Sequence, residues 1–268
     1  MAYIFAILFG IVEGITEWLP ISSTGHMILL EKWVDFPMSD SFMSMFLVVI
    51  QLGAILAVTV LYWRQLIPYS RNAGWELPTI QMWLKIAVAC IPVVILELLF
   101  GDRMEALFYN YQTVAIMLVV VGIAFLLVER WNENRTPEVE EISEISYRQA
   151  FFVGVFQLAA AVFPGTSRSG ATIIGGLCLG LSRKAAAQFT FFLAIPVMFG
   201  ASLLKVKGFG WNFTGQEMLV LLLGMASAFA VSLLVIRFLM QYVQKNDFRV
   251  FGWYRIILGI LVFLFFFR

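Results

Sequence analysis

The sequence contains few charged residues. Only 13% of its 268 residues are Asp, Glu, Lys or Arg, whereas 61% are hydrophobic and the mean hydropathy is +0.89. A soluble domain usually carries about 25% charged residues. A chain of this length with so few charges cannot coat a water-facing surface. The composition therefore excludes an ordinary soluble protein and predicts an integral membrane protein.

Cysteine and histidine are also scarce. The two cysteines, Cys90 and Cys178, both lie in apolar segments, which argues against a disulfide framework and is typical of small buried side chains. His26 is the single histidine of the chain. The net charge of +1 gives no reason to expect nucleic acid or a strongly anionic protein as a partner.

Six segments are long and apolar enough to cross a bilayer, which takes about 20 helical residues. They are residues 42–63, 84–100, 113–128, 189–204, 218–239 and 253–267. Two further apolar stretches, residues 1–33 and 147–181, are interrupted by proline and polar residues. Irregular backbone at membrane depth is tolerated only where protein or water covers it. We therefore expect these two stretches to form re-entrant helix–loop–helix hairpins.

The two halves of the chain resemble each other. Gly10 and Ser23 match Gly154 and Ser167 at a constant separation of 144 residues, and three predicted spans follow each hairpin. Because three is an odd number, the second half must have the opposite orientation, which is the inverted-topology repeat. The expected fold is an all-α polytopic membrane protein, divided into a first repeat (1–131), a cytoplasmic linker (132–146) and a second repeat (147–268).

The distribution of Lys and Arg predicts the orientation. Five of them fall on the side that carries both termini and the mouth of the first hairpin: Lys32, Arg103, Lys205, Lys207 and Arg268. Twelve fall in the loops on the other side: Arg64, Arg71, Lys85, Arg130, Arg135, Arg148, Arg183, Lys184, Arg237, Lys245, Arg249 and Arg255. The side with more Lys and Arg is cytoplasmic. Both termini and the mouth of the first hairpin are therefore expected outside, and the polar stretch 129–148 is expected to be a solvated loop.

Glu13 and Glu17 lie four residues apart, so they share one face of a helix. Two carboxylates in apolar surroundings repel each other and are costly to ionise. A divalent cation, an arginine or a shared proton would offset this cost, which predicts a metal or proton site. The alternative is that one or both carboxylates lie at the aqueous end of a short helix.

A polar run follows the two acids and consists of Ser22, Ser23, Thr24, Gly25 and His26. Hydroxyl and backbone N–H groups at the start of a helix form a cradle for an anion such as phosphate, although Ser22–Thr24 alone could be an ordinary helix cap. A histidine in a polar loop at membrane depth suits proton transfer or nucleophilic attack. The alternative for His26 is a structural hydrogen bond.

The second polar loop, residues 164–172, contains an arginine flanked by glycines and hydroxyls. The guanidinium of Arg168 suits bidentate contact with a phosphate and keeps its charge. We expect Ser167, Ser169, Gly170 and Thr172 to contact the phosphate beside it.

Of the two polar motifs, only the first carries the two acids and the histidine, and only the second carries an arginine. This division favours one composite site, in which Arg168 could also neutralise Glu13 or Glu17. Gln51 could line this site, but a helix–helix hydrogen bond is the simpler role for it.

Residues 13–26 (EGITEWLPISSTGH) and 164–172 (PGTSRSGAT) resemble the two signatures of the undecaprenyl-diphosphate phosphatase family, which is associated with bacitracin resistance. The resemblance covers the whole chain. It implies hydrolysis of undecaprenyl diphosphate to undecaprenyl phosphate and inorganic phosphate, with Mg²⁺ or Ca²⁺, in the bacterial plasma membrane. It further implies recycling of the lipid carrier of cell-wall synthesis. The other superfamily of lipid phosphatases needs more than one histidine, and His26 is the only one here.

The resemblance and the residue types together predict roles. Glu13 and Glu17 hold the cation, or one of them accepts a proton, and Arg168 clamps the phosphoryl oxygens. The nucleophile stays open between Ser23, His26 and water. The partners are the polyprenyl diphosphate and membrane lipids, and a homodimer is one of the oligomeric states left open. The rival function is a transporter or flippase of a prenyl phosphate lipid, because inverted repeats with broken helices also build transporters.

Overall fold

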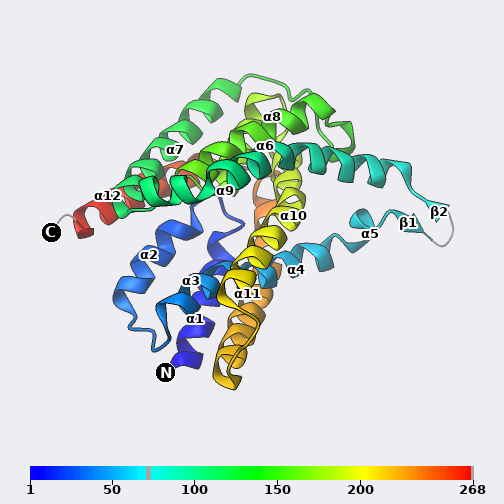
Figure 1. The fold of residues 1–268 in the computed structure, drawn as a ribbon. Coiled ribbons are helices and arrows are strands. Elements are labelled where there is room, and N and C mark those ends of the chain that lie inside the picture. Colours follow the sequence, from blue (N-terminus) through cyan, green and yellow to red (C-terminus); the bar gives the residue numbers. More distant parts are fainter. Residues whose placement is uncertain (71–73, 267–268) are drawn as a thin grey trace.

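The computed structural model describes residues 1–70 and 74–266, and most of them are helical (Figure 1). The α-helices are α1 (Ala2–Thr16), α2 (Ser23–Trp33), α3 (Asp40–Val49), α4 (Gln51–Leu61), α5 (Trp63–Leu66), α6 (Leu77–Phe108), α7 (Tyr111–Asn132), α8 (Tyr147–Val162), α9 (Arg168–Cys178), α10 (Arg183–Phe209), α11 (Gly215–Tyr242) and α12 (Arg249–Phe266). A 3-10 turn, η1 (Ile142–Glu144), and an antiparallel pair of short strands, β1 (Tyr69–Ser70) and β2 (Gly74–Trp75), complete the described elements.

Six stretches of the described chain are long and apolar enough to cross a membrane, which confirms the six predicted spans and the all-α polytopic fold. They are Asp40–Leu61, Leu77–Gly101, Tyr111–Asn132, Arg183–Phe209, Gly215–Tyr242 and Arg249–Phe266. Most of them extend beyond the predicted bounds, because the helices include polar turns at their ends that hydropathy does not detect. At the starts of α10 and α11, for example, the side chains of Ser182 and Thr214 cap such polar turns. The predicted last residue of the final span, Phe267, lies outside the described residues.

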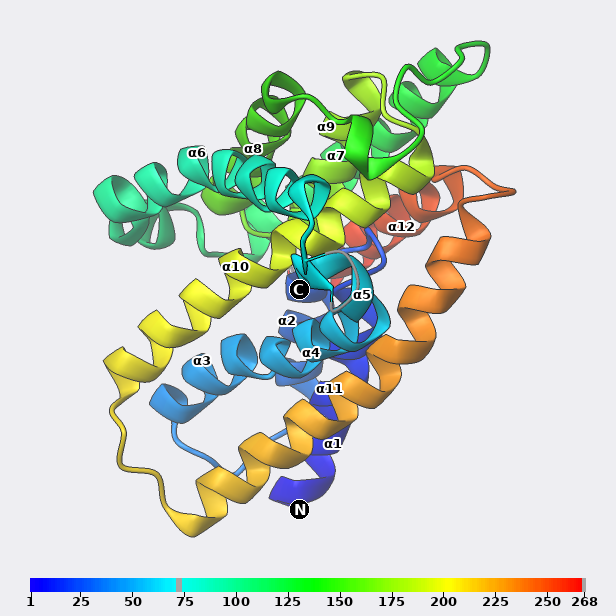
Figure 2. The same cartoon turned by 90° about the vertical axis from the view of Figure 1, so that its right-hand side faces the viewer.

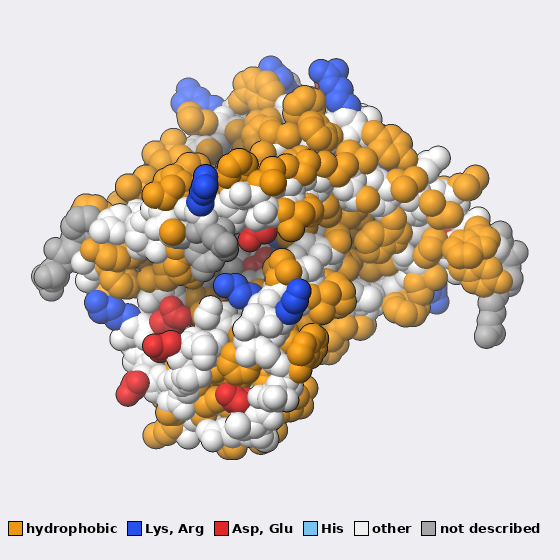
Figure 3. All heavy atoms as spheres, viewed as in Figure 1, with side chains coloured by type: hydrophobic (Ala, Val, Ile, Leu, Met, Phe, Trp, Pro, Cys, Tyr) orange, Lys and Arg blue, Asp and Glu red, His pale blue; other side chains and the backbone are white. Residues whose placement is uncertain are grey.

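The outer surface is apolar over much of its area, as a lipid-facing surface requires. Figure 3 shows hydrophobic side chains over much of the face that it presents, with basic side chains along its top edge and beside the hollow near its centre. Leu98 and Leu234 are examples of large apolar side chains that are 75% and 68% exposed. An apolar surface of this extent would be unstable in water, which agrees with the membrane prediction.

Two helix–loop–helix hairpins, α1–α2 and α8–α9, lie where the sequence predicts them. Each is followed by three spans, the first of which is divided into α3 and α4 in the first half. The hairpins exchange partners between the halves: α1 packs along α11, and α8 packs along α6 (Figures 1 and 2). The last spans of the two halves, α7 and α12, pack against each other. The two halves are therefore interlocked, whereas their inverted orientation in the membrane and the exact repeat boundaries remain predictions.

Two glycines make this interlocking close. A Cβ atom on Gly10 would lie 2.0 Å from the hydroxyl of Ser227 on α11, and one on Gly154 would lie 2.1 Å from the carbonyl oxygen of Ala89 on α6. Only glycine allows backbones to approach this closely. The repeat matches these two glycines to each other, and each seats its hairpin on the second span of the other half.

Three charged residues that the sequence predicts in loops are buried in helices. Lys85 lies in α6 and donates a hydrogen bond of 2.9 Å to the carbonyl of Ser143. Glu129, predicted to begin a solvated loop, has no exposed surface; it pairs with Arg183 and accepts a hydrogen bond of 2.9 Å from the backbone of Phe248. Arg255, predicted to be a cytoplasmic loop charge, is fully buried inside α12. The three differences have one cause: local sequence places a charge near the end of an apolar segment in water, although a partner elsewhere in the chain can hold it inside.

Candidate active site

The loops of the two hairpins have the same unusual backbone. Ser22 and Ser167 have φ angles of 72° and 70°, and among residues 1–70 and 74–266 no other non-glycine residue has a positive φ. Each serine caps the helix that follows, accepting a hydrogen bond from the backbone of Gly25 at 3.3 Å or Gly170 at 3.2 Å. Backbone strain of this kind is typical of functional sites.

This geometry corrects the alignment of the two loops. The sequence repeat matches Ser23 to Ser167, but the structural equivalents are Ser22 and Ser167, because these two residues share the positive φ and the capping bond. Between the matched glycine and the capping serine, the second hairpin (Gly154 to Ser167) has one residue more than the first (Gly10 to Ser22), and a constant separation along the sequence cannot follow that change. Ser23 is therefore equivalent to Arg168. The candidate nucleophile and the candidate phosphate-binding arginine are thus the first residues of α2 and α9.

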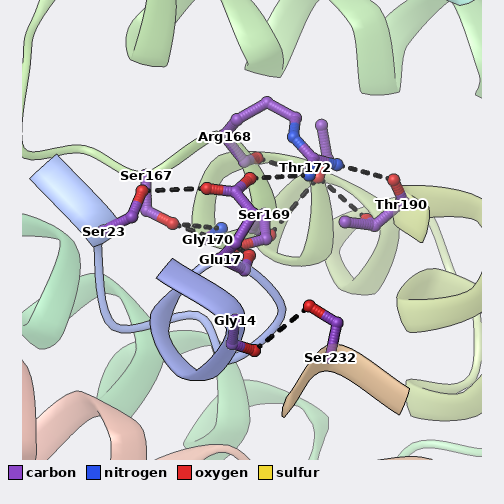
Figure 4. Close-up of polar contacts among 10 residues, drawn as sticks. All are labelled: Gly14, Glu17, Ser23, Ser167, Arg168, Ser169, Gly170, Thr172, Thr190 and Ser232. Carbon is purple, nitrogen blue, oxygen red and sulfur yellow. Dashed lines mark hydrogen bonds and ion pairs between the residues drawn. The ribbon is translucent and has the colours of Figure 1, made fainter. Parts of the chain in front are cut away.

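Ser23 and Arg168 meet at the carboxylate of Glu17, a buried residue (Figure 4). The hydroxyl of Ser23 donates to Oε2 of Glu17 at 2.8 Å, and Nη2 of Arg168 donates to Oε1 at 2.9 Å. Glu17 comes from the end of α1, whereas Ser23 and Arg168 are the first residues of α2 and α9. The structure thus brings the two halves together in one composite site, in the pattern of a nucleophile, a base and a group that orients the base.

The other residues of the second loop hold Arg168 and Glu17 in place. Nη1 of Arg168 donates to the carbonyl of Thr190 on α10 at 2.7 Å. The hydroxyl of Thr172 lies 2.9 Å from the carbonyl of Arg168 and 2.8 Å from the hydroxyl of Thr190. Ser169 donates to the backbone carbonyl of Glu17 at 3.1 Å and lies 3.0 Å from the hydroxyl of Ser167. These contacts fix the guanidinium on two sides.

Glu13 lies one turn before Glu17 on α1 and is 1% exposed. Its Oε1 atom has no hydrogen-bond partner within the part of the chain that the structure describes. Burial, and then the neighbouring charge of Glu17, raises the pKa of the Glu13 carboxyl well above its usual range. A buried carboxylate oxygen without a donor is suited to a cation.

The donor set around Glu13 fits a hard divalent cation with few protein ligands. Across residues 1–70 and 74–266, no group of three or more His, Cys, Asp and Glu side chains is placed to hold a metal ion. Both oxygens of Glu17 already accept hydrogen bonds, which leaves Glu13 as the open carboxylate. Mg²⁺ commonly binds through one or two carboxylates together with water and substrate phosphate oxygens. The residues present are compatible with this arrangement.

His26 lies beside the site with both ring nitrogens engaged. Nδ1 is 2.7 Å from the carbonyl oxygen of Ser22, and Nε2 is 2.7 Å from the hydroxyl of Tyr254. A carbonyl only accepts, so Nδ1 carries the hydrogen and Nε2 accepts from the tyrosine. Burial lowers the pKa of His26, which favours this neutral form. Neither of these two hydrogen bonds goes to Ser23, and the role of His26 in catalysis stays a prediction.

Two residues of α12 were missed by the sequence analysis. Tyr254 holds His26, and the buried Arg255 donates to backbone carbonyls of both hairpin loops. One signal could have identified Arg255: the last predicted span begins at residue 253, so this arginine lies inside an apolar span. A charged residue there is costly and commonly functional. Nothing in the sequence around Tyr254 distinguishes it from the other aromatic residues of the spans.

An open cleft of about 510 Å³ lies next to the hairpin loops. It is lined by Thr24 and Pro164 from the two loops and by charged residues that include Glu31, Glu97 and Lys205. Figure 3 shows a hollow below α6 with acidic side chains in it and basic side chains near its edge. The cleft reaches Thr24, which follows Ser23, but Glu17, Ser23 and Arg168 are not among the residues that line it.

Gln51 is half-buried at the start of α4. Within the described residues no hydrogen bond joins its side chain to the site, so its predicted role rests on the sequence alone.

Comparison with known proteins agrees with these motifs. The family model for "Bacitracin resistance protein BacA" matches residues 6–261. The chain belongs to the BacA family. It is 61% identical over 263 residues to the undecaprenyl-diphosphatase of Desulfitobacterium hafniense, covering 97% of this chain and 95% of that protein. It is 57% identical over 263 residues to undecaprenyl-diphosphatase 1 of Clostridium acetobutylicum, covering 97% and 96%. The family resemblance inferred from residues 13–26 and 164–172 is therefore confirmed.

Proposed function

We propose that this chain is a membrane phosphatase that hydrolyses undecaprenyl diphosphate to undecaprenyl phosphate and inorganic phosphate. BacA-family relatives that are 57–61% identical over nearly the whole chain carry the name undecaprenyl-diphosphatase. The observation that carries the proposal is the carboxylate of Glu17, held between the hydroxyl of Ser23 and the guanidinium of Arg168. Phosphoryl transfer to a side chain requires a nucleophilic hydroxyl, a base that accepts its proton and a positive group that binds the phosphate, and Ser23, Glu17 and Arg168 are of these three types.

The geometry favours Ser23 as the nucleophile. Its hydroxyl already donates to Glu17 at 2.8 Å, whereas both nitrogens of His26 are occupied. Ser23 Oγ attacks the terminal phosphorus while Glu17 Oε2 accepts the hydroxyl proton. The new Oγ–P bond replaces the bond from phosphorus to the bridging oxygen, and undecaprenyl phosphate leaves. Water then attacks the phosphoserine, which returns the Ser23 hydroxyl and releases inorganic phosphate.

The surrounding groups stabilise the negative charge of the diphosphate. Ser23 and Arg168 open helices α2 and α9, so two helix N-termini meet at the reacting group. Helix N-termini attract phosphate through their free N–H groups and dipoles. Arg168 adds a fixed positive charge. A divalent cation held by the open oxygen of Glu13, with or without Glu17, would neutralise further charge on the diphosphate.

Phosphate release from undecaprenyl diphosphate by the purified protein in detergent tests this function. We expect release by the wild type and its loss in Ser23→Ala and Glu17→Gln. Thr59→Ala is the matched control, because among the described residues that hydroxyl donates only to the carbonyl of Ile55 in its own helix. A wild-type protein that binds the lipid and releases no phosphate would instead support a carrier of prenyl phosphate lipids. Full activity in Ser23→Ala would transfer the role of nucleophile to water or His26.

The orientation is a further part of the proposal: the protein lies in the bacterial plasma membrane, with the site and both termini facing outward. The excess of Lys and Arg in the opposite loops supports this orientation, even without the buried Arg255. Single cysteines placed beside Lys205 and Lys245 should react with membrane-impermeant reagents from outside and inside, respectively. Labelling of both from one side would contradict the inverted repeat.

A further inference from the structure

Arg255 is a fully buried arginine near the middle of α12, and it contacts both hairpin loops. Its Nη1 donates to the carbonyl of Pro20 at 3.2 Å, in the first loop. Its Nη2 donates to the carbonyls of Gly165 and Thr166 at 2.7 and 2.9 Å, in the second loop. Pro20 lies two residues before the strained Ser22, and Thr166 directly precedes the strained Ser167. One guanidinium therefore bridges the two segments that deliver Ser23 and Arg168.

Stability alone does not account for this residue. None of the ion pairs between described residues involves Arg255, and its Nε atom has no partner among them. A buried charge without an opposite charge is costly, and apolar side chains of similar size often stabilise a protein more. The planar fork of arginine, however, can hold two separate backbone segments in a fixed relation.

The packing of α12 gives this fork a rigid support. A Cβ on Gly252 would lie 2.9 Å from the carbonyl of Gly122, and one on Gly259 would lie 2.8 Å from the carbonyl of Ala115, so α12 lies directly against α7 on both sides of Arg255. A Cβ on Gly170 would lie 3.3 Å from Nη1 of Arg255, so the start of α9 also packs close to the guanidinium.

We propose that Arg255 is a positioning residue of the phosphatase reaction, which holds the two hairpin loops in register so that Ser23, Glu17 and Arg168 meet. The proposal rests on the phosphatase function proposed above. Arg255 acts through the loop carbonyls, and among the described residues none of its hydrogen bonds goes to the side chain of Glu17, Ser23 or Arg168. Its loss should therefore slow the chemical step and leave the affinity for the lipid nearly unchanged.

The test compares Arg255→Lys and Arg255→Gln with the wild type in detergent, measuring kcat, KM and thermal unfolding. A misplacement of about 1 Å can cost about 100-fold in rate, so we expect kcat to fall about 10- to 100-fold with KM within about twofold. Arg183→Lys is the matched control, because Arg183 pairs with Glu129 rather than with either hairpin loop. It should lower thermal stability and leave the kcat of the folded protein unchanged.

A double variant distinguishes positioning from a general loss of structure. If Arg255 acts by aligning the second loop, its loss should matter little once Arg168 is absent, so Arg255→Lys should cost less than about threefold further in Arg168→Ala. Additive losses, a kcat within twofold of wild type in both Arg255 variants, or a failure of both variants to fold would each overturn the proposal. A wild-type protein that releases no phosphate would overturn the phosphatase function itself and, with it, this role.

Discussion

Replacing Arg168 with lysine separates the charge of this residue from its geometry. In the structure the guanidinium donates to Glu17 Oε1 at 2.9 Å and, through its other terminal nitrogen, to the carbonyl of Thr190 at 2.7 Å. The ammonium of lysine is a single point and cannot reproduce both contacts in the same plane. Arg168→Lys therefore keeps one positive charge at the site and loses at least one charge-assisted hydrogen bond.

The magnitude follows from that lost bond. The Arg168 and Glu17 side chains are only 12% and 7% exposed, so water does not replace the interaction. A hydrogen bond to a charged group contributes about 1.5–3 kcal/mol. If the bond is needed in the transition state, kcat/KM should fall by about 10- to 150-fold, since about 1.4 kcal/mol corresponds to a factor of ten. Arg168→Ala should cost more, because it leaves the buried carboxylate of Glu17 without its counter-ion.

The assay is phosphate release from undecaprenyl diphosphate at several substrate concentrations, with thermal unfolding of the same preparations. Arg237→Lys is the matched control, because Arg237 is exposed on α11. A kcat/KM for Arg168→Lys within twofold of wild type would refute the reasoning that the planar fork is required. A loss of activity that only parallels a loss of folded protein would refute the claim that Arg168 acts in the transition state.

Three further predictions concern the histidine, the cation and the hairpin packing. Tyr254→Phe removes the donor that stabilises neutral His26. The pKa of the histidine should therefore rise, and the acid limb of the pH–rate profile should move to higher pH. An unchanged profile would show that this hydrogen bond does not affect the reaction. Chelation of divalent cations should abolish phosphate release, and Glu13→Gln should raise the Mg²⁺ concentration needed to restore it about tenfold or more; restoration at the wild-type concentration would exclude Glu13 as a ligand. Gly154→Ala should destabilise the protein by about 1–3 kcal/mol through overpacking, whereas Gly200→Ala, where a Cβ would meet nothing within 4 Å, should not; equal thermal stability of both would contradict the close approach of α8 to α6.

Much of the fold follows from local sequence. Hydropathy summed over about 20 residues predicts the six spans, because each helix satisfies its own backbone and needs only apolar side chains to enter lipid. The interruptions at residues 1–33 and 147–181 predict the two hairpins for the same reason, since polar loops at that depth require cover. Gly10 and Gly154 also follow from the repeat, because the same close packing recurs in both halves.

The site could be predicted in composition but not in arrangement. The sequence alone identifies Glu17, Ser23 and Arg168 as candidates, but it aligns Ser23 with Ser167 and pairs His26 with the phosphate chemistry. The structure pairs Ser22 with Ser167 through their positive φ angles, and it adds a contact between His26 and Tyr254 that the sequence does not predict. A one-residue difference in loop length and a contact across 228 residues leave no trace in a local pattern.

The sequence by itself determined that the protein lies in a membrane, where its helices and two polar loops fall, and to which family it belongs, because hydropathy and motifs depend on neighbouring residues. Only the tertiary structure decided which groups meet. Arg168 reaches Glu17 across 151 residues, and Arg255 joins Pro20 to Gly165 and Thr166. Hydrogen bonds and ion pairs act over about 3 Å in space and are indifferent to distance along the chain, so the partners of a buried charge are set by how the two halves interlock.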